Sequence, residues 1–150
     1  MTAAIPLWFF APSLALFGLL FGSFANVVIW RVPRGESVVS PGSHCPRCEM
    51  PIAWYDNIPV VSWIALRARC RSCGAPIAAR YPAVETASGV LFAVAALRYG
   101  VSWAALSAAV LFWFLLVLSV IDLDTMRLPN PLVGSLGALG LIAAVLSPVT

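Results

Sequence analysis

The chain has 150 residues, of which 61% are hydrophobic and only 10% are charged, and its formal net charge at pH 7 is +3. Soluble domains usually carry about 25% charged residues, so this composition indicates a membrane protein and argues against a soluble globular domain. All nine basic residues are arginines, and they form no basic stripe interleaved with polar surface. We therefore expect a membrane protein that does not bind nucleic acid.

Four apolar segments follow one another along the chain, and each is a candidate transmembrane helix. At a rise of about 1.5 Å per residue, about 20 residues cross the hydrocarbon core of a bilayer. By that measure the second segment is barely long enough to cross the bilayer. The tight turn "LRYG" after it predicts that the second and third helices are antiparallel neighbours. The pattern predicts an all-α polytopic membrane protein with about four spans, at residues 5–30, 82–99, 101–120 and 131–149.

One long loop, residues 31–83, holds seven of the nine arginines. Because arginine-rich loops stay in the cytoplasm, this loop is predicted to be cytoplasmic and the N-terminus to lie outside. The third helix then runs inward and brings Asp122 and Asp124 to the cytoplasmic side. The sequence thus predicts three parts, which are a first transmembrane helix (1–30), a cytoplasmic loop (31–83) and the remaining three helices (84–150).

The long loop contains an internal repeat. "CPRCEMPIA" begins at Cys45 and "CRSCGAPIA" begins 25 residues later at Cys70, and both read C-x-x-C-x-x-P-I-A. Two such knuckles supply the four thiolates of a tetrahedral structural zinc site, and the reducing cytoplasm argues against structural disulfides. The alternative is that the cysteines are redox pairs. We favour zinc bound by Cys45, Cys48, Cys70 and Cys73.

The segment between the knuckles, "WYDNIPVVSWIALRA" (54–68), is too apolar for a free loop. Its apolar side chains are expected either to pack on the zinc module or to lie on the bilayer surface. The alternative is a surface that docks a substrate.

Polar residues within the apolar segments have two interpretations. Asn26 and Ser23 are expected to hydrogen-bond between helices, and the small residues Gly18 and Gly22 are expected to let two helices of this chain approach closely. Glu85 near the start of the second segment either marks a functional site or sits at the membrane interface beside Arg80.

The stretch "LSVIDLDTMRLPNP" (118–131) places two carboxylates, Asp122 and Asp124, where an uncharged helix ends. From these residues alone, the two aspartates are most simply solvated helix caps beside Arg127. A catalytic role needs support from the rest of the chain.

That support is a resemblance. "FGSFANVVIWRVP", the paired "CPRC" and "CRSC", "DNIPVVSW", "ARYPAVE" and "IDLDTMRLPN" occur together and in this order over residues 21–130. The set closely resembles the bacterial prepilin peptidases, or type IV leader peptidases, which are GxGD-type intramembrane aspartyl proteases of the bacterial inner membrane. Members cleave the leader peptides of type IV prepilins and pseudopilins at the cytoplasmic membrane face. Many also methylate the new N-terminus with S-adenosylmethionine.

The resemblance implies that Asp122 is the first catalytic aspartate, because it opens the family's D-x-x-x-x-x-x-P stretch. Asp124 then points to another side of the helix, and residues at i and i+2 do not face each other. The family's second aspartate, in a G-x-G-D motif, is absent from these 150 residues. We therefore expect a fragment, a half-enzyme completed by a chain or segment supplying the second aspartate, or an inactive relative.

A further departure from the family pattern concerns methylation. Ala68 stands where the family commonly has glycine before the second knuckle, which leaves methylation less secure than cleavage, and no S-adenosylmethionine site can be placed. The alternative to the enzyme is a non-catalytic, zinc-stapled membrane module that binds prepilins or an assembly partner.

Overall fold

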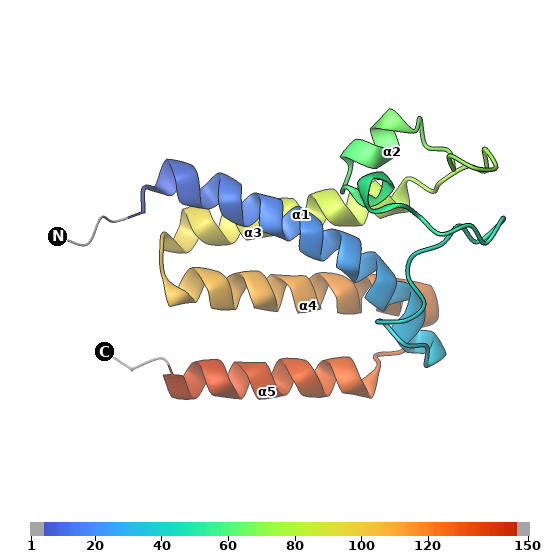
Figure 1. The fold of residues 1–150 in the computed structure, drawn as a ribbon. Coiled ribbons are helices and arrows are strands. Elements are labelled where there is room, and N and C mark those ends of the chain that lie inside the picture. The colour runs from blue at the N-terminus through green and yellow to red at the C-terminus, as the bar shows by residue number, and fades with distance from the viewer. Residues whose placement is uncertain (1–4, 147–150) are drawn as a thin grey trace.

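The structure is a computed structural model that describes residues 5–146, and it is helical. Figure 1 shows the four long helices lying side by side, with the loop that joins the first two gathered at one end. The long helices are α1 (Leu7–Arg31), α3 (Arg80–Tyr99), α4 (Trp103–Thr125) and α5 (Asn130–Leu146), and the loop contains η1 (Val32–Arg34), η2 (Trp54–Asn57) and α2 (Val61–Ala65). The predicted all-α class is confirmed.

Two helices within the described range are long and apolar enough to cross a membrane, and they extend over Leu7–Arg34 and Trp103–Thr125. Helix α3 carries charge at both ends and at Glu85, and α5 is described over 17 residues only. The four long helices thus lie where the sequence predicts them, and the apolar pair supports a membrane protein. That α3 and α5 also cross the bilayer stays a prediction.

Helices α1 and α3 form the most extensive helix pair, and glycines make this close approach possible. A Cβ atom on Gly22 would lie 2.6 Å from the Cα of Glu85, and one on Gly18 would lie 2.7 Å from the carbonyl oxygen of Ser88. The Asn26 side-chain amide of α1 also donates to the carbonyl of Tyr81 in α3 at 3.1 Å. The expected contact between helices of this chain is therefore confirmed.

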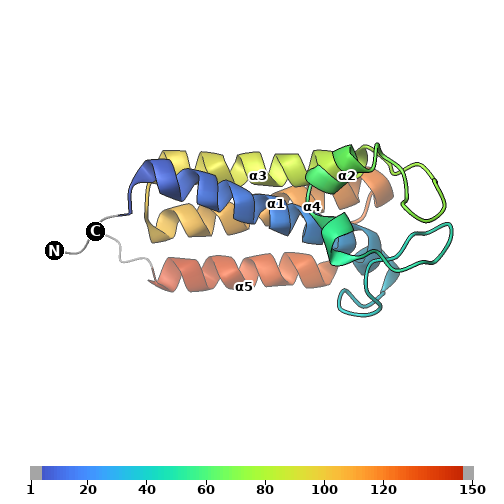
Figure 2. The ribbon, with the colours of Figure 1, turned by 45° about the horizontal axis from the view of Figure 1, so that its top comes forward.

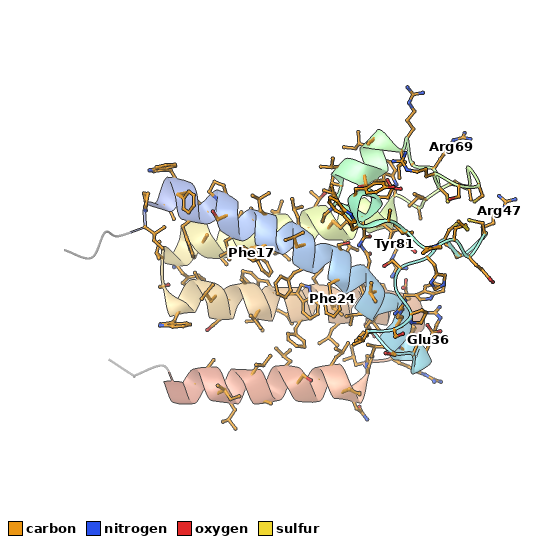
Figure 3. The ribbon with its side chains drawn as sticks, in the orientation of Figure 1. Phe17, Phe24, Glu36, Arg47, Arg69 and Tyr81 are labelled. Atoms are coloured by element: carbon orange, nitrogen blue, oxygen red, sulfur yellow. The ribbon has the colours of Figure 1, made fainter. Side chains whose placement is uncertain are left out.

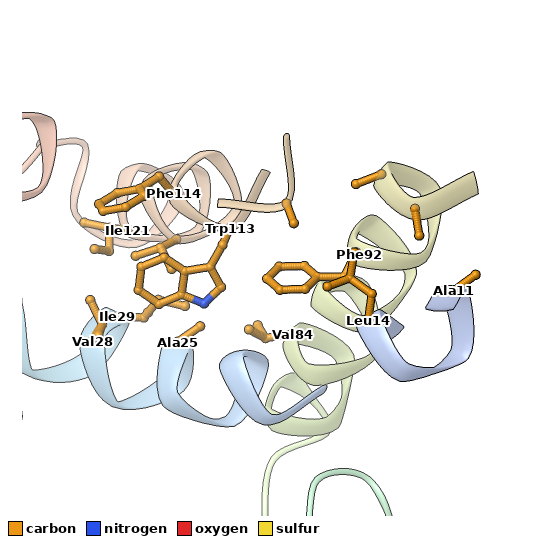
Figure 4. Close-up of a cluster of buried hydrophobic side chains, with 14 residues drawn as sticks. Ala11, Leu14, Ala25, Val28, Ile29, Val84, Phe92, Trp113, Phe114 and Ile121 are labelled. Carbon is orange, nitrogen blue, oxygen red and sulfur yellow. The ribbon is translucent and has the colours of Figure 1, made fainter. Parts of the chain in front are cut away.

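Helix α4 closes the core against α1 and α3, chiefly through Trp113. Its indole N–H donates to the carbonyl oxygen of Phe21 at 2.8 Å, and its ring stacks on Phe24 with centroids 6.0 Å apart. Figure 4 shows Trp113 between the side chains of α1 and Phe92 of α3. The tryptophan thus satisfies its one polar group while it fills the space where three helices meet.

The connections between the helices place the candidate residues at one end of the bundle. Gly100, with φ of +63°, ends α3, and the Ser102 side chain caps α4 by accepting from the Ala105 N–H at 3.2 Å. This is the predicted tight turn. Figures 1 and 2 show this turn at one end, and the cysteine-containing loop together with the end of α4 at the other.

Candidate functional site

The sequence repeat in the loop is also a structural repeat. In the first knuckle the Cys45 N–H donates to the carbonyl of Met50 at 3.0 Å, and the Glu49 N–H donates to the carbonyl of Cys45 at 2.9 Å. In the second knuckle, Cys70 donates to Ala75 at 2.8 Å and Gly74 donates to Cys70 at 2.9 Å. Each knuckle also has one isolated β-bridge, His44–Pro51 and Arg69–Pro76.

The two knuckles bring all four cysteines together. Their sulfur atoms lie within 4.8 Å of one another, those of Cys45 and Cys73 are 3.9 Å apart, and all four cysteines are free thiols. A tetrahedral zinc ion with Zn–S bonds of about 2.3 Å holds its sulfurs about 3.8 Å apart. The cluster therefore fits a metal ion bound by four thiolates.

His44 lies beside the first knuckle but outside the sulfur cluster. Its Nδ1 is 3.1 Å from the carbonyl oxygen of Gly42. One ring nitrogen is therefore engaged by the carbonyl of its own loop.

Backbone amides activate one of the thiols. The N–H groups of Arg47 and Cys48 point at the Cys45 sulfur and lower the pKa of this thiol from 9.0 to about 6. At Cys48 the Met50 N–H also lowers the pKa, but burial and the neighbouring thiols outweigh it and raise the pKa to about 11. Four crowded thiols that cannot all ionise without a counter-charge are suited to a soft divalent cation.

The segment between the knuckles is tied to the second one. The Arg71 guanidinium donates two hydrogen bonds to the Asp56 carboxylate, both of 2.7 Å, and this pairing holds the pKa of Asp56 below its usual value. The Trp63 indole N–H donates to the carbonyl of Ile77 at 3.1 Å. Helices η2 and α2 are thus attached to the cysteine cluster by a charged pair and by a packed tryptophan.

Glu85 joins this segment to the helical bundle. Its side chain is buried, and one carboxylate oxygen accepts the N–H of Val60 at 2.7 Å. Arg80 is therefore not the partner of Glu85, and the position of Glu85 at the membrane interface stays a prediction. Arg80 pairs instead with Asp124, because it lies at the start of α3, next to the end of the antiparallel α4.

The two aspartates at the end of α4 have different surroundings. Asp124 forms the ion pair with Arg80, whereas the exposed Asp122 side chain has no hydrogen bond or ion pair with any residue in the range 5–146. The helix ends just beyond them, where the Met126 N–H bonds to the Asp122 carbonyl at 2.7 Å and Met126 adopts φ of +54°. Asp122 and Asp124 thus share no partner among the described residues.

A shallow groove of about 380 Å³ runs between α3 and α4 beside the Arg80–Asp124 ion pair. Apolar side chains of both helices line it, with the ion pair at its edge. Asp124 lines this groove and Asp122 does not. The sequence did not reveal Arg80 as the partner of Asp124, because the two residues are 44 positions apart and only the helix packing brings them together.

Two family models match the chain, one after the other. The bacterial peptidase A24 N-terminal domain matches residues 16–99, which include the four cysteines and Glu85. The type IV leader peptidase family matches residues 109–150, which include Asp122 and Asp124. No solved structure matches the chain significantly.

Curated relatives agree with these models. The chain is 51% identical to the prepilin leader peptidase/N-methyltransferase of Myxococcus xanthus over 81% of its own length and 37% of that protein. It is 42% identical to the enzyme of the same name from Neisseria gonorrhoeae, over 89% of the chain and 55% of that protein. For the enzyme from Stutzerimonas stutzeri the identity is 40%, over 93% of the chain and 56% of that protein. The chain spans about half the length of the curated relatives it matches.

The first family model covers more than half of the chain, and it includes both halves of the cysteine cluster. The second adds the end of α4 with its free carboxylate. The chain therefore belongs to the bacterial prepilin peptidase family, also known as the type IV leader peptidases.

Proposed function

We propose that this chain is the part of a prepilin peptidase that supplies one catalytic carboxylate, Asp122, for cleavage of prepilin or pseudopilin leader peptides. The observation that carries the proposal is the free carboxylate of Asp122 at the end of an apolar helix, beside an aspartate that is already engaged by Arg80. The relatives' name supplies the substrate class.

The proposed chemistry is aspartic. One ionised carboxylate takes a proton from water, and a second, protonated carboxyl polarises the scissile carbonyl. Asp122 lies at the end of a helix that is apolar enough to cross a membrane, so it meets water on one side and low dielectric on the other. Asp124 is not the second carboxyl in this proposal, because residues two apart on a helix do not face each other and Asp124 is bound to Arg80. We propose that another chain or segment supplies it.

The four cysteines have a structural role in this proposal. A zinc ion bound by Cys45, Cys48, Cys70 and Cys73 staples the two knuckles together and leaves no open position for water. The site lies in the cytoplasm at the inner membrane, on the same side as Asp122, as the seven arginines of the loop favour.

Methylation of the new N-terminus with S-adenosylmethionine is the second proposed activity, and it rests on the N-methyltransferase name of the relatives. The departure at Ala68 has a conformational explanation that does not involve the methyl donor. Ala68 has φ of +57°, a conformation that glycine adopts without strain. A glycine preference at this position therefore reflects the local turn, and Ala68 is no argument against methylation.

The test compares two isosteric variants in an enzyme whose second aspartate is supplied. Asp122→Asn should reduce cleavage of a prepilin by about 100-fold or more, because the amide cannot exchange the proton. Asp124→Asn should keep substantial activity, because removing the charge of Asp124 weakens only its exposed ion pair with Arg80. Cleavage is read from the N-terminus of the product, and both variants must retain the metal content of the parent protein.

Two outcomes would contradict the assignment. An inactive Asp124→Asn together with an active Asp122→Asn would reverse the roles of the two residues. Normal cleavage by both variants would make the aspartates helix caps, and the chain would then be better described as a non-catalytic module that binds prepilins or an assembly partner.

A further inference from the structure

The segment between the two knuckles carries several large apolar side chains that no other part of residues 5–146 covers. We refer to them as the apolar face, which consists of Trp54 (80% exposed), Val61 (60%) and Ile64 (64%), with Tyr55 and Ile58 at its edge. Exposed apolar groups of this size, gathered on one short segment, mark an interaction surface.

Internal hydrogen bonds hold the apolar face outward. The Ser62 hydroxyl is buried, donates to the carbonyl of Tyr55 at 2.9 Å and accepts the N–H of Ile58 at 3.0 Å. Val61 and Ile64, three residues apart, lie on the same side of the short helix α2. The face is thus a fixed feature of the fold.

The hydrogen bond from the Val60 N–H to the Glu85 carboxylate fixes the position of this apolar face along the axis of the bundle. Glu85 follows Arg80 by five residues, so it lies about 7.5 Å into α3 from the end of that helix. Its carboxylate holds the start of α2 at that level. Figure 1 accordingly shows α2 beside the end of α3, whereas Figure 3 shows Arg47 and Arg69 of the knuckles extending away from the bundle.

Exposed tryptophans of the long helices mark two levels along the bundle. At one end lie Trp8 of α1 and Trp103 of α4, which are 77% and 85% exposed. At the other end lies Trp30 of α1, 53% exposed, with the Arg34 guanidinium stacked 3.6 Å above its ring. Trp8 and Trp30 are 22 residues apart, about 33 Å along a helix, which matches the thickness of the hydrocarbon core.

We propose that the apolar face of η2 and α2 lies in the lipid interface of the cytoplasmic leaflet, where it anchors the cysteine module to the membrane surface. Its tryptophan and tyrosine are the residue types that concentrate at the lipid interface. Glu85, which holds the start of α2, packs against Gly22 of α1, inward of Trp30 and therefore within the depth of the bilayer. The exposed Arg67 and Arg69 follow directly and suit anionic headgroups. The occupant is therefore the lipid bilayer.

The test uses a photo-crosslinking residue, benzoylphenylalanine, in the intact protein in nanodiscs of phosphatidylethanolamine and phosphatidylglycerol. It replaces Val61 or Ile64. Leu20 of α1, 58% exposed between the two aromatic levels, is the lipid-facing control, and Val39, 85% exposed in the loop before the first knuckle, is the water-facing control. Lipid adducts are counted by mass spectrometry after irradiation.

Positions 61 and 64 should form lipid adducts at a level comparable to position 20 and several-fold above position 39. Labelling at 61 and 64 as low as at 39 would overturn the proposal, and so would crosslinks from these positions to a second protein. These outcomes are independent of proteolysis, since the measurement does not use a prepilin.

The hydrogen bond from Val60 can be tested in the same way. Glu85→Gln keeps an oxygen that accepts the Val60 N–H, so lipid labelling at position 61 should persist. Glu85→Ala removes the acceptor, so labelling should fall toward the level of position 39. Unchanged labelling in a folded, metal-containing Glu85→Ala protein would show that Glu85 does not fix the position of the apolar face.

Discussion

Single side chains decide whether the cysteine cluster holds a metal. Cys73 is the most exposed of the four cysteines, yet its sulfur lies 3.9 Å from that of the buried Cys45. Exposure therefore does not exclude Cys73 from the site, because the second knuckle turns its sulfur toward the first.

We expect the purified chain to contain about one zinc ion, and Cys73→Ser to lose most of it, because serine does not replace a thiolate ligand at neutral pH. Metal analysis of the reduced protein measures this. Ser72→Ala, in the same knuckle, is the matched control and should retain its metal. Full metal occupancy in Cys73→Ser, or no zinc in the folded parent protein, would contradict the four-thiolate site.

Backbone conformation around the second knuckle leads to another prediction at this scale. Ala68 is held at φ of +57° by two hydrogen bonds, from its N–H to Trp63 at 2.8 Å and from Ile77 to its carbonyl at 2.7 Å. Ala68→Gly should raise the free energy of unfolding by up to about 1 kcal/mol, because alanine is strained in this region. Thermal unfolding of the metal-bound protein in detergent measures the change.

Ala65→Gly, at the end of α2, is the control for that substitution and should lower stability, because glycine weakens a helix. A decrease in stability for both variants would mean that the positive φ of Ala68 carries no strain.

At the scale of helices, the pairing of α1 with α3 depends on the absence of side chains. Gly18 and Gly22 each leave room for the backbone of α3, and Gly89 of α3 leaves room for Leu19. This packing also positions Glu85, whose Cα is the atom that a Cβ on Gly22 would approach most closely. The glycine contact is therefore connected to the attachment of the cysteine module.

Gly22→Ala should lower the free energy of unfolding by about 1–3 kcal/mol, because its methyl group would lie 2.6 Å from a backbone atom of α3. Gly137→Ala in α5, where an added Cβ would have no side chain or other helix of residues 5–146 within 4 Å, is the control and should leave stability unchanged or higher. Denaturation in mild detergent compares the two variants. Equal tolerance of both substitutions would show that α1 and α3 do not approach this closely.

At the scale of the whole molecule, the cysteine loop and the α4–α5 connection lie at one end of the bundle, and the turn at Gly100 lies at the other (Figure 2). A reporter inserted beside Arg67 should therefore behave as cytoplasmic, and one inserted at Gly100 as extracytoplasmic, because seven arginines are on the loop side. Alkaline phosphatase and fluorescent-protein fusions measure this. The opposite pattern would place the cysteines in an oxidising compartment and favour the redox interpretation.

Much of the architecture followed from local spacing alone. The helical class, the positions of the four long helices and the pairing of the two C-x-x-C motifs depend on residues close together in the chain, where hydrophobic runs and short repeats carry the information. The glycine contact was predicted as well, because a G-x-x-x-G spacing places both glycines on one helix face.

Partner choice was decided by the tertiary structure. Arg80 binds Asp124 across 44 residues and Glu85 accepts from Val60 across 25. One of the two interpretations of the sequence had placed Glu85 beside Arg80, because the two are near neighbours in the chain. The pairing of charged groups depends on where the helices end and how they pack. The local hydrophobic period of the sequence carries no information about either. The same packing leaves the Asp122 carboxylate without a partner among the described residues. It also turns Trp54 and Ile64 outward and fixes their position along α3.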